Sequence, residues 1–507
     1  MYYKWDKSRA ENHIDNLCEE VREVTIKQYT RDKSLSNIKV NEAYAMDAVH
    51  LYVDILNLEG ILTTQNGTES DTTHQRAIRF FDSHVRAIKF ILAETGSIFV
   101  DFHNQRLHAV IAKPYSKKKK KARLDRAIAI ADLIMESVQQ QREVVGDDAI
   151  EAAEIRIGID TGLALAVNNG RRSNREPLFL GNPANYAAKH ASGDTVGIYL
   201  TSKARSVINL SLDASQDTKK IKLKTSEIES SKQSADLSVT PQDVSDELKK
   251  NEKKLKDFQF SRTTPPLKKL EFDELYYKSA KRQEIVSIYA DIDGFTNFVG
   301  KNIDSEEGKK NIVRALHVLR SEMDDTLYSD HEGRRVRFIG DCLHGLICEG
   351  SSKTTDFSKS VDVATEAVSA IRSSFLMSLD KLGEYFDIED LKKLGLAIGY
   401  EIGDVSLTRV GKIGDTSRYA IGVSTIESEN AQKVCKGNAT KIGANAYKYL
   451  SDNYKVLFKD QVAADLTYDQ VKSIDEAESS KNESTKGSFY DSAPHVQNGL
   501  KAHAKLK

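Results

Sequence analysis

Two aspartates close an apolar stretch in the segment YADIDGFTNF at 289–298, and a glycine and a phenylalanine follow them directly. A further acidic residue, Asp341, lies in RFIGDCLHG at 337–345, which reads as a hairpin turn. Carboxylates at a strand end and in a facing turn can hold divalent cations, although a single Asp-x-Asp-Gly is also an ordinary polar turn. Asp291 and Asp341 are therefore candidate metal ligands, and the carbonyl of Ile292 is a further candidate oxygen donor.

The overall composition restricts the class of protein without identifying it. The chain has 507 residues, enough for two or more domains, and its 74 lysines and arginines nearly balance its 75 aspartates and glutamates. This balance gives no reason to expect a nucleic acid or a membrane surface as a partner. No apolar run approaches the roughly 20 residues that span a bilayer, and the four cysteines show no paired or metal-ligand spacing. We therefore expect a cytoplasmic protein with reduced thiols.

The chain contains one pattern twice. Four segments of the first half have counterparts in the second half, in the same order: HLYVDILNL with SIYADIDGF, RLHAVI with CLHGLI, IRIGIDTG with LAIGYEIG, and LFLGNPANYAAKHA with YAIGVSTIESENAQ. The distance between counterparts shifts by only a few residues, which chance matches would not maintain. In each half the pattern predicts a strand, a long helix, a hairpin, a helix, two strands and a helix. We expect an α+β fold in which helices cover a mixed sheet.

The predicted boundaries follow from composition. Residues 213–275 are rich in Lys, Ser, Asp, Glu and Thr and contain few large apolar side chains, so we interpret them as a charged linker. Part of this linker, near 244–258, has the pattern of a solvated helix. The two repeated units then occupy 1–212 and 276–470, and 471–507 is a predicted disordered tail.

Three motifs together resemble those of the class III nucleotidyl cyclases. YADIDGFT is similar to the first metal motif of that family, RFIGDCLHG to the second, and GNPANYAAKHA to its helix-opening Gly-x-x-x-Asn-x-Ala-x-Arg. The resemblance covers most of both halves and leaves out the linker and the tail. It implies two ferredoxin-like cyclase domains that pack as an intramolecular pseudo-dimer, with the catalytic sites at their shared face. It also implies two Mg²⁺ or Mn²⁺ ions and a nucleoside triphosphate substrate.

The resemblance also assigns roles to residues. Asp291, Asp341 and the carbonyl of Ile292 would hold the metal ions, and the amides that open the next helix would receive the triphosphate, at Gly294, Phe295 and Thr296. Asn185 matches the family's transition-state Asn, and Lys189 stands where the family has Arg. Two alternatives remain open: Asn185 as a helix cap, and Lys189 as a solvated surface lysine.

The two halves are not equally equipped. An ungapped alignment of the hairpins places Gln105 opposite Asp341, so Asp54, the counterpart of Asp291, lacks a partner carboxylate. A gapped alignment would make Asp101 that partner, but FVDFHNQRLHAVI already reads as a hairpin with a two-residue Asn-Gln turn. In the second half Ile426 and Asn430 replace the Asn and the Arg of the helix motif, in that order. We therefore predict one competent composite site and one degenerate site.

The base-reading positions differ from those of the usual purine cyclases. The second half has Arg337 and Tyr419 at these positions, and the first half has Asp101 and Leu178. Together with Tyr289, the residues Arg337 and Tyr419 resemble the bacterial pyrimidine cyclases of anti-phage defence. In the composite arrangement, however, Arg337 and Tyr419 would face the degenerate site and Asp101 the competent one.

Three hypotheses follow for the function. The first is a cyclase that converts UTP or CTP to a 3′,5′-cyclic nucleotide, which a separate effector protein reads in anti-phage defence. The second is a purine cyclase, most plausibly for GTP. The third is a catalytically inactive cyclase fold that binds a nucleotide for regulation, a reading favoured by the replacements at Gln105 and Ile426.

Overall fold

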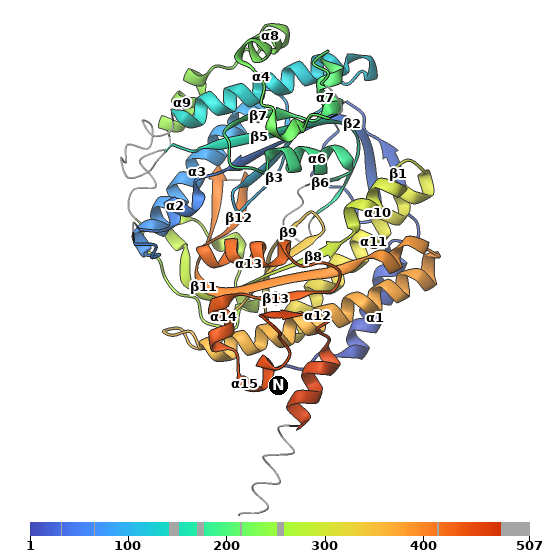
Figure 1. Cartoon of the computed structure of the whole chain (residues 1–507), viewed down its shortest axis with the longest axis vertical. Helices are drawn as coiled ribbons and strands as arrows, with labels where there is room; N and C mark the ends of the chain where they lie inside the picture. Colours follow the sequence, from blue (N-terminus) through green and yellow to red (C-terminus); the bar gives the residue numbers. More distant parts are fainter. Residues whose placement is uncertain are drawn as a thin grey trace, which may run out of the picture.

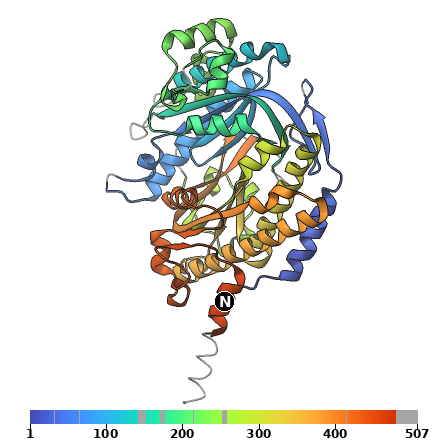
Figure 2. The same cartoon turned by 45° about the vertical axis from the view of Figure 1, so that its right-hand side comes forward.

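The computed structural model describes residues 1–31, 33–64, 66–140, 152–169, 177–212, 215–250, 258–412 and 415–477. In this part of the chain, each half forms its own mixed β-sheet, and helices cover the outer side of each sheet (Figure 1). The same two stacked layers are visible in Figure 2. The predicted α+β class is confirmed. No helix among the described residues is long and apolar enough to cross a membrane.

The first sheet is built around a long central strand. Its main path has the order β3-β4-β2-β5-β6, and β1 and β7 add to its sides. The strands are β1 Thr25–Gln28, β2 Glu42–Ile55, β3 Ile98–His103, β4 Arg106–Ile111, β5 Ile155–Asn168, β6 Pro177–Leu180 and β7 Gly197–Leu200. Asn104 has a positive φ of 47° in the turn between β3 and β4, so the predicted two-residue Asn-Gln hairpin is confirmed.

The second sheet repeats this arrangement. Its path is β14-β13-β11-β8-β10-β9, with β12 paired to β11. The strands are β8 Lys281–Asp293, β9 Arg334–Ile339, β10 Cys342–Ile347, β11 Gly395–Lys412, β12 Asp415–Ile421, β13 Thr440–Ile442 and β14 Val462–Ala463. The registers also agree between the halves: Tyr52 pairs with His108 and Gly158, and Tyr289 pairs with His344 and Gly399. The predicted duplication therefore extends to individual strand positions.

One helix of each half lies between the two sheets (Figure 1). These helices are α6 Asn182–Ala191 and α13 Val423–Lys433. Each packs directly on a glycine of its own sheet, because a Cβ atom on Gly158 would come within 2.1 Å of an α6 carbonyl and one on Gly399 within 2.2 Å of an α13 amide. These glycines let the helix that bears the motif lie flat against the strands.

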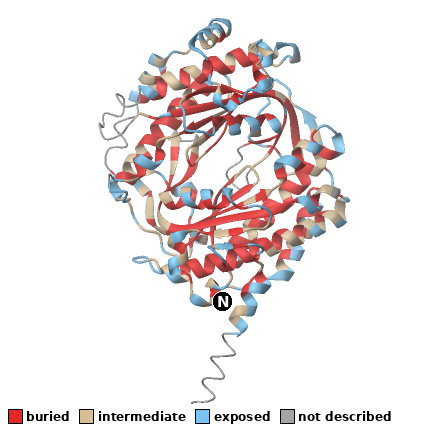
Figure 3. Ribbon diagram, in the orientation of Figure 1, coloured by how far each residue is buried: buried red, intermediate tan, exposed pale blue. Residues whose placement is uncertain are grey.

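The remaining helices form the outer layers. The first half uses α2 Leu58–Leu62, α3 Asp71–Glu94, α4 Lys120–Gln139 and α7 Ser202–Val207. The second half uses α10 Phe295–Asn302, α11 Glu306–Asp325, α12 Phe357–Phe386, α14 Ala444–Tyr449 and α15 Asp452–Lys455. Figure 3 shows buried residues along both sheets and on the inward faces of these helices. Apolar burial on both sides of each sheet is what stabilises such a layered fold.

The apolar core crosses the boundary between the halves. One cluster joins Ala45 and Leu165 of the first sheet to residues of β8, α10 and α11. A second cluster joins Val410, Tyr419 and Ile421 of the second half to residues of α3 and β3. Because both clusters contain residues of both halves, the two units are held together by shared apolar burial as well as by the linker.

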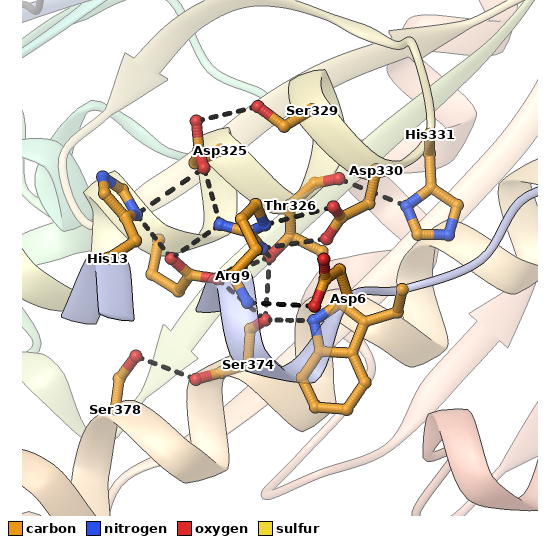
Figure 4. Close-up of polar contacts among 12 residues, drawn as sticks. Asp6, Arg9, His13, Asp325, Thr326, Ser329, Asp330, His331, Ser374 and Ser378 are labelled. Atoms are coloured by element: carbon orange, nitrogen blue, oxygen red, sulfur yellow. Dashed lines mark hydrogen bonds and ion pairs between the residues drawn. The ribbon is translucent and has the colours of Figure 1, made fainter. Parts of the chain in front are cut away.

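The N-terminal helix belongs spatially to the second half. Helix α1, Lys7–Glu20, lies against α11 and α12. Its Arg9 donates hydrogen bonds to Asp325 at 2.6 Å, to Glu322 at 2.8 Å and to Asp330 at 2.8 Å. The indole of Trp5 also donates to Ser374 at 2.9 Å. Figure 4 shows Arg9 beside Asp325 and Asp330, so a built-in cation offsets part of this negative charge.

The predicted linker is more ordered than its composition suggests. It contains α8 Thr225–Ala235, which packs on α4, and α9 Pro241–Lys249, which packs on α3. Val244 and Leu248 of α9 are buried, although a solvated helix was expected in this region. Residues 213–214 and 251–257 lie outside the described residues. The division into two units and a linker stays a prediction, but the segment is not uniformly solvated.

The predicted tail also begins inside ordered structure. Residues 468–477 are helical, and Val471 is fully buried there. Only the part of the predicted tail after residue 477 lies outside the described residues.

Candidate active site

Three carboxylates gather where β8 ends and the β9–β10 hairpin turns. Asp291 and Asp293 belong to the last three residues of β8, and Asp341 follows Gly340 in the hairpin turn. Gln432 of α13 donates to Asp291 at 3.4 Å, and the backbone amide of Gly437 donates to Asp293 at 2.6 Å. All three carboxylates are half-buried. Asp291 and Asp341, which the sequence motifs singled out, therefore belong to one acidic cluster.

The cluster carries more negative charge than its surroundings compensate. Burial raises the pKa of Asp291 to about 6, and the charges of Asp293 and Glu429 add to this shift. Burial also raises the pKa of Asp341 well above its usual value, with Asp291 as the next contribution. Within the described residues, none of the three forms an ion pair with a lysine or an arginine. Oxygen donors with this excess charge fit a hard divalent cation such as Mg²⁺ or Mn²⁺.

The helix that follows the cluster begins with free backbone amides. Gly294 precedes α10 with a φ of +86°, and a Cβ atom there would lie 3.1 Å from the carbonyl oxygen of Lys393. Phe295 is buried and anchors the helix start, whereas Thr296 is exposed. The first amides of a helix have no partner within the helix and can bind phosphate oxygens. The geometry at Gly294, Phe295 and Thr296 therefore agrees with the phosphate-binding role implied by the motif.

Asn185 lies at the start of α6, which approaches α10 from the other half. A Cβ atom on Gly181 would come within 3.1 Å of Ile303, and one on Gly300 within 3.4 Å of Asn182. Helix α6 begins after Gly181, and no side chain caps it, so the helix-cap alternative for Asn185 is wrong. Asn185 is half-buried near this contact between the halves. Lys189 is exposed one turn further on, with its ammonium 5.5 Å from the centre of the Tyr186 ring.

The equivalent acidic position of the first half is neutralised internally. Asp54 is buried, and Arg106 donates to its carboxylate at 2.6 Å. Gln105 occupies the turn position that Asp341 has in the second half. Asn104 of the same hairpin lines a small pocket together with mainly apolar side chains, among them Leu58, Leu62, Phe81, Tyr419, Ile421 and Ile426. A paired carboxylate and an apolar lining do not suit a metal-bound triphosphate.

The predicted base-reading residues meet at the boundary between the halves. Arg337 and Asp101 form a buried ion pair, and Arg337 also donates to the backbone carbonyls of Phe102 and Arg418. Burial opposes ionisation of Asp101, but Arg337 and His103 outweigh it and lower the pKa of this carboxyl. The sequence placed Asp101 and Arg337 in separate sites, whereas the structure joins them. The two occupy equivalent positions of the two hairpins, since Asp101 pairs with His108 and Arg337 with His344.

The two predicted tyrosines are also buried at this boundary. The hydroxyl of Tyr289 donates to Asn104 of the opposite hairpin at 2.8 Å, and its ring stacks on His344. The ring of Tyr419 stacks on Phe102 with centroids 5.4 Å apart, and Tyr419 lines the same pocket as Ile426. Both side chains therefore contact residues of the first half.

Comparisons with known proteins agree with this geometry. The profile of the adenylate and guanylate cyclase catalytic domain matches residues 277–465. A uridylate cyclase of Pseudomonas aeruginosa is 46% identical over 480 residues, which cover 93% of this chain and 91% of the relative. The chain belongs to the class III nucleotidyl cyclases. It is thus a nucleotidyl cyclase, a phosphorus–oxygen lyase, and this family uses divalent metal ions.

Two further relatives cover most of this cyclase. A uridylate cyclase of a Rhizobium species is 34% identical over 455 residues, which cover 87% of this chain and 85% of the relative. A crystal structure of a class III adenylyl cyclase-like ATP-binding protein from Pseudomonas aeruginosa superimposes with a TM-score of 0.87 at 45% identity. The match covers 94% of this chain and 100% of that chain, so the likeness includes both halves of the cyclase.

The sequence motifs missed several residues of the cyclase site. Asp293 stood inside the quoted motif, and its place beside Asp291 was a usable signal for a third carboxylate. Glu429 of α13, which accepts a hydrogen bond from Asn104, and Arg106, which neutralises Asp54, gave no recognisable pattern. Their roles depend on contacts between segments far apart in the chain.

Proposed function

We propose that this cyclase converts UTP to 3′,5′-cyclic UMP and pyrophosphate at one composite site between its halves. The observation that carries the proposal is the crowding of Asp291, Asp293 and Asp341 without a cationic side chain paired to them among the described residues, at the boundary where α6 brings Asn185. The preference for a pyrimidine is supported by two relatives that are named uridylate cyclases and align with most of the chain.

The proposed catalytic roles are divided between residues of the two halves. Asp291, Asp341 and the carbonyl of Ile292 would hold two Mg²⁺ or Mn²⁺ ions, with Asp293 beside them. When bound, such ions lower the pKa of the ribose 3′-hydroxyl and neutralise phosphate charge. The amides of Gly294, Phe295 and Thr296 are free to bind the triphosphate.

The proposed reaction is an intramolecular displacement at the α-phosphorus. The 3′-hydroxyl releases its proton to solvent and its oxygen bonds to the α-phosphorus, while the bond from the α-phosphorus to the bridging oxygen breaks and pyrophosphate leaves with that electron pair. Negative charge develops on the α-phosphate oxygens during this step. The side-chain amide of Asn185 and the ammonium of Lys189 are suited to stabilise that charge. Lysine keeps the charge of the family's arginine but lacks its two-pronged geometry.

The base preference would come from bulky side chains at the boundary. Arg337 and Tyr289 are buried there, and we propose that they limit the room for the second ring of a purine, whereas Tyr419 lies against Phe102. The ion pair with Arg337 also keeps Asp101 ionised, so its carboxylate is an acceptor for the imino N–H of uracil.

The proposal is tested by incubating the purified cyclase with each of the four ribonucleoside triphosphates and Mn²⁺, and then separating the products. We expect cyclic UMP and pyrophosphate as the main products. A cyclic purine as the main product would overturn the pyrimidine assignment. Nucleotide binding without release of pyrophosphate would support the inactive regulator instead.

A matched pair of variants tests the base preference. Tyr289→Phe removes the hydroxyl that contacts Asn104, and Tyr52→Phe makes the same change at the equivalent position of the first half. We expect only Tyr289→Phe to change the ratio of kcat/KM for UTP to that for GTP. If the ratio of kcat/KM for UTP to that for GTP were the same in both variants, Tyr289 would not belong to the base site.

We also infer that cyclic UMP acts as a diffusible second messenger, read by a separate effector protein in anti-phage defence. The resemblance to the defence cyclases at Tyr289, Arg337 and Tyr419 supports this role. Bacteria that express the cyclase with its genomic neighbours should survive phage challenge better than bacteria with the Asp291→Asn variant. Equal survival would contradict the defence role and leave the cyclase reaction intact.

A further inference from the structure

Arg320 lies on the apolar face of α11, directly behind the metal-binding turn. Its side chain is buried, and the guanidinium lies 4.5 Å from the centre of the Phe338 ring. A charged group in such a place is costly unless hydrogen-bond acceptors surround it. In the described part of the chain no carboxylate forms an ion pair with Arg320. The acceptors that it does contact are neutral, and this sets it apart from Arg9 and Arg106.

One acceptor of Arg320 belongs to the turn that carries Asp341. The guanidinium donates to the carbonyl oxygen of Gly340 at 2.9 Å. This carbonyl lies in the same rigid peptide plane as the backbone nitrogen of Asp341, so the hydrogen bond fixes the orientation of that peptide. Gly340 has a φ of +64°, in the left-handed region that glycine adopts readily.

The other acceptors of Arg320 belong to the opposite half. The guanidinium donates to the side-chain oxygen of Asn169 at 2.7 Å and to the carbonyl oxygen of Asn168 at 3.2 Å. These residues stand at the end of β5, which pairs with β6, and β6 leads into the α6 helix that bears Asn185. One side chain thus links the metal-binding turn of one half to the strand pair that positions the catalytic helix of the other.

We propose that Arg320 is a positioning residue that holds the Asp341 turn and the first half in the relative orientation needed for cyclisation. This inference rests on the proposed role of Asp341 as a metal ligand. Contacts that orient a metal ligand typically change metal affinity or activity about 10- to 100-fold when they are removed.

The test compares Arg320→Met with Arg372→Met in the full-length protein. Arg372 is a matched control, because it is a buried arginine of the same half that donates to Thr440 and Ala439, both in that half. We expect Arg320→Met to weaken Mn²⁺ binding about tenfold, measured without nucleotide by electron paramagnetic resonance. We expect kcat to fall by a similar factor. Arg372→Met should lower the melting temperature and leave both quantities near the wild-type values.

Two milder variants keep the proposal testable if Arg320→Met does not fold. Arg320→Lys retains the charge and one donor group and should recover part of the Mn²⁺ affinity. Asn169→Ala removes one acceptor in the first half, and should lower kcat while Mn²⁺ binding stays near normal. Wild-type Mn²⁺ affinity in both Arg320 variants, or equal losses in Arg372→Met, would overturn the proposal.

Two outcomes distinguish a failure of the positioning role from a failure of the proposed function. If wild-type protein binds Mn²⁺ but makes no cyclic nucleotide, the cyclase proposal fails, and the Arg320 comparison of Mn²⁺ affinity still decides the positioning role. If Asp341→Asn binds Mn²⁺ as well as the wild type, Asp341 is not a ligand and the positioning proposal fails with it.

Discussion

Asp54 and Asp291 occupy equivalent positions on the central strands of the two sheets, yet their charges are compensated in opposite ways. Asp54 has a cation from its own sheet, since Arg106 on the neighbouring strand binds it at 2.6 Å. Asp291 has two further carboxylates beside it and no ion pair among the described residues. The first arrangement is complete without a ligand, whereas the second is unfavourable until a proton or a metal ion joins it.

This difference shows how a duplicated domain divides its functions. The first half keeps the helix with Asn185 and has closed its own acidic site with an internal arginine. The second half keeps the acidic site and has an isoleucine, Ile426, in place of the asparagine. In the proposed arrangement, where each site takes its parts from both halves, the loss of one component in each half leaves one complete site.

The largest expected effect comes from replacing the two equivalent aspartates separately. Asp291→Asn should lower kcat at least about a hundredfold, because an anionic metal ligand is lost. In EDTA the same variant should unfold at a higher denaturant concentration than the wild type, because the carboxylate crowding is relieved. Cyclic nucleotide formation and urea unfolding measure the two effects.

Asp54→Asn should instead lower stability and leave kcat almost unchanged. It leaves Arg106 without its anion, which should cost about 3 kcal/mol of unfolding free energy, while kcat of the folded enzyme stays within about twofold of the wild type. If both variants lost activity to the same extent, the two sites would be functionally equivalent and the comparison would fail.

The helix positions provide the next comparison. Asn185→Ala should lower kcat about a hundredfold with little change in the KM for UTP, because the amide acts mainly on charge that develops in the transition state. Ile426→Ala at the equivalent position should leave kcat unchanged and cost about 1 kcal/mol of stability through lost apolar contact. Steady-state kinetics of both variants test this prediction. If Asn185→Ala raised only the KM, Asn185 would bind the substrate in the ground state and would not act on the transition state.

The cluster around Arg9 extends the comparison to a third acidic site. Glu322, Asp325 and Asp330 share one cation, Arg9, whereas Asp54 has Arg106 to itself (Figure 4). Arg9→Met should therefore lower the free energy of unfolding by about 2 kcal/mol, the upper range for a pair that is partly open to solvent. The kcat of the folded enzyme should not change. A large loss of activity at full folding would instead connect α1 to catalysis.

The last comparison concerns the pH dependence of stability. The pKa of Asp291 is raised from 3.8 to about 6 in the folded protein, so between these values the folded state binds more protons than the unfolded state. The stability of the metal-free protein should accordingly fall as the pH rises from about 4 to 6. Asp291→Asn should flatten this slope, and saturating Mn²⁺ should reverse it. Thermal unfolding across this pH range measures all three, and an identical slope in the variant would contradict the assignment.

The sequence predicted the parts of the site that depend on local pattern. The two repeats, the Asn-Gln hairpin, and the strand end and turn that carry Asp291 and Asp341 were all recognisable, because alternation and turn residues are local properties. The capping alternative for Asn185 could not be decided in the same way, since the helix start at Gly181 emerges only when the backbone is folded.

The amino-acid sequence by itself determined the cyclase family, the duplication and the unequal distribution of catalytic residues, because each of these follows from residue types at regular spacings. Only the tertiary structure decided which charges meet: Arg106 with Asp54, Arg337 with Asp101, and Arg320 with the Asp341 turn. The contacts of Arg337 and Arg320 also join the two halves, and none of the three has a local signature. The contacts of Arg337 and Arg320 depend on how the two sheets pack against each other, and this is a property of the whole fold.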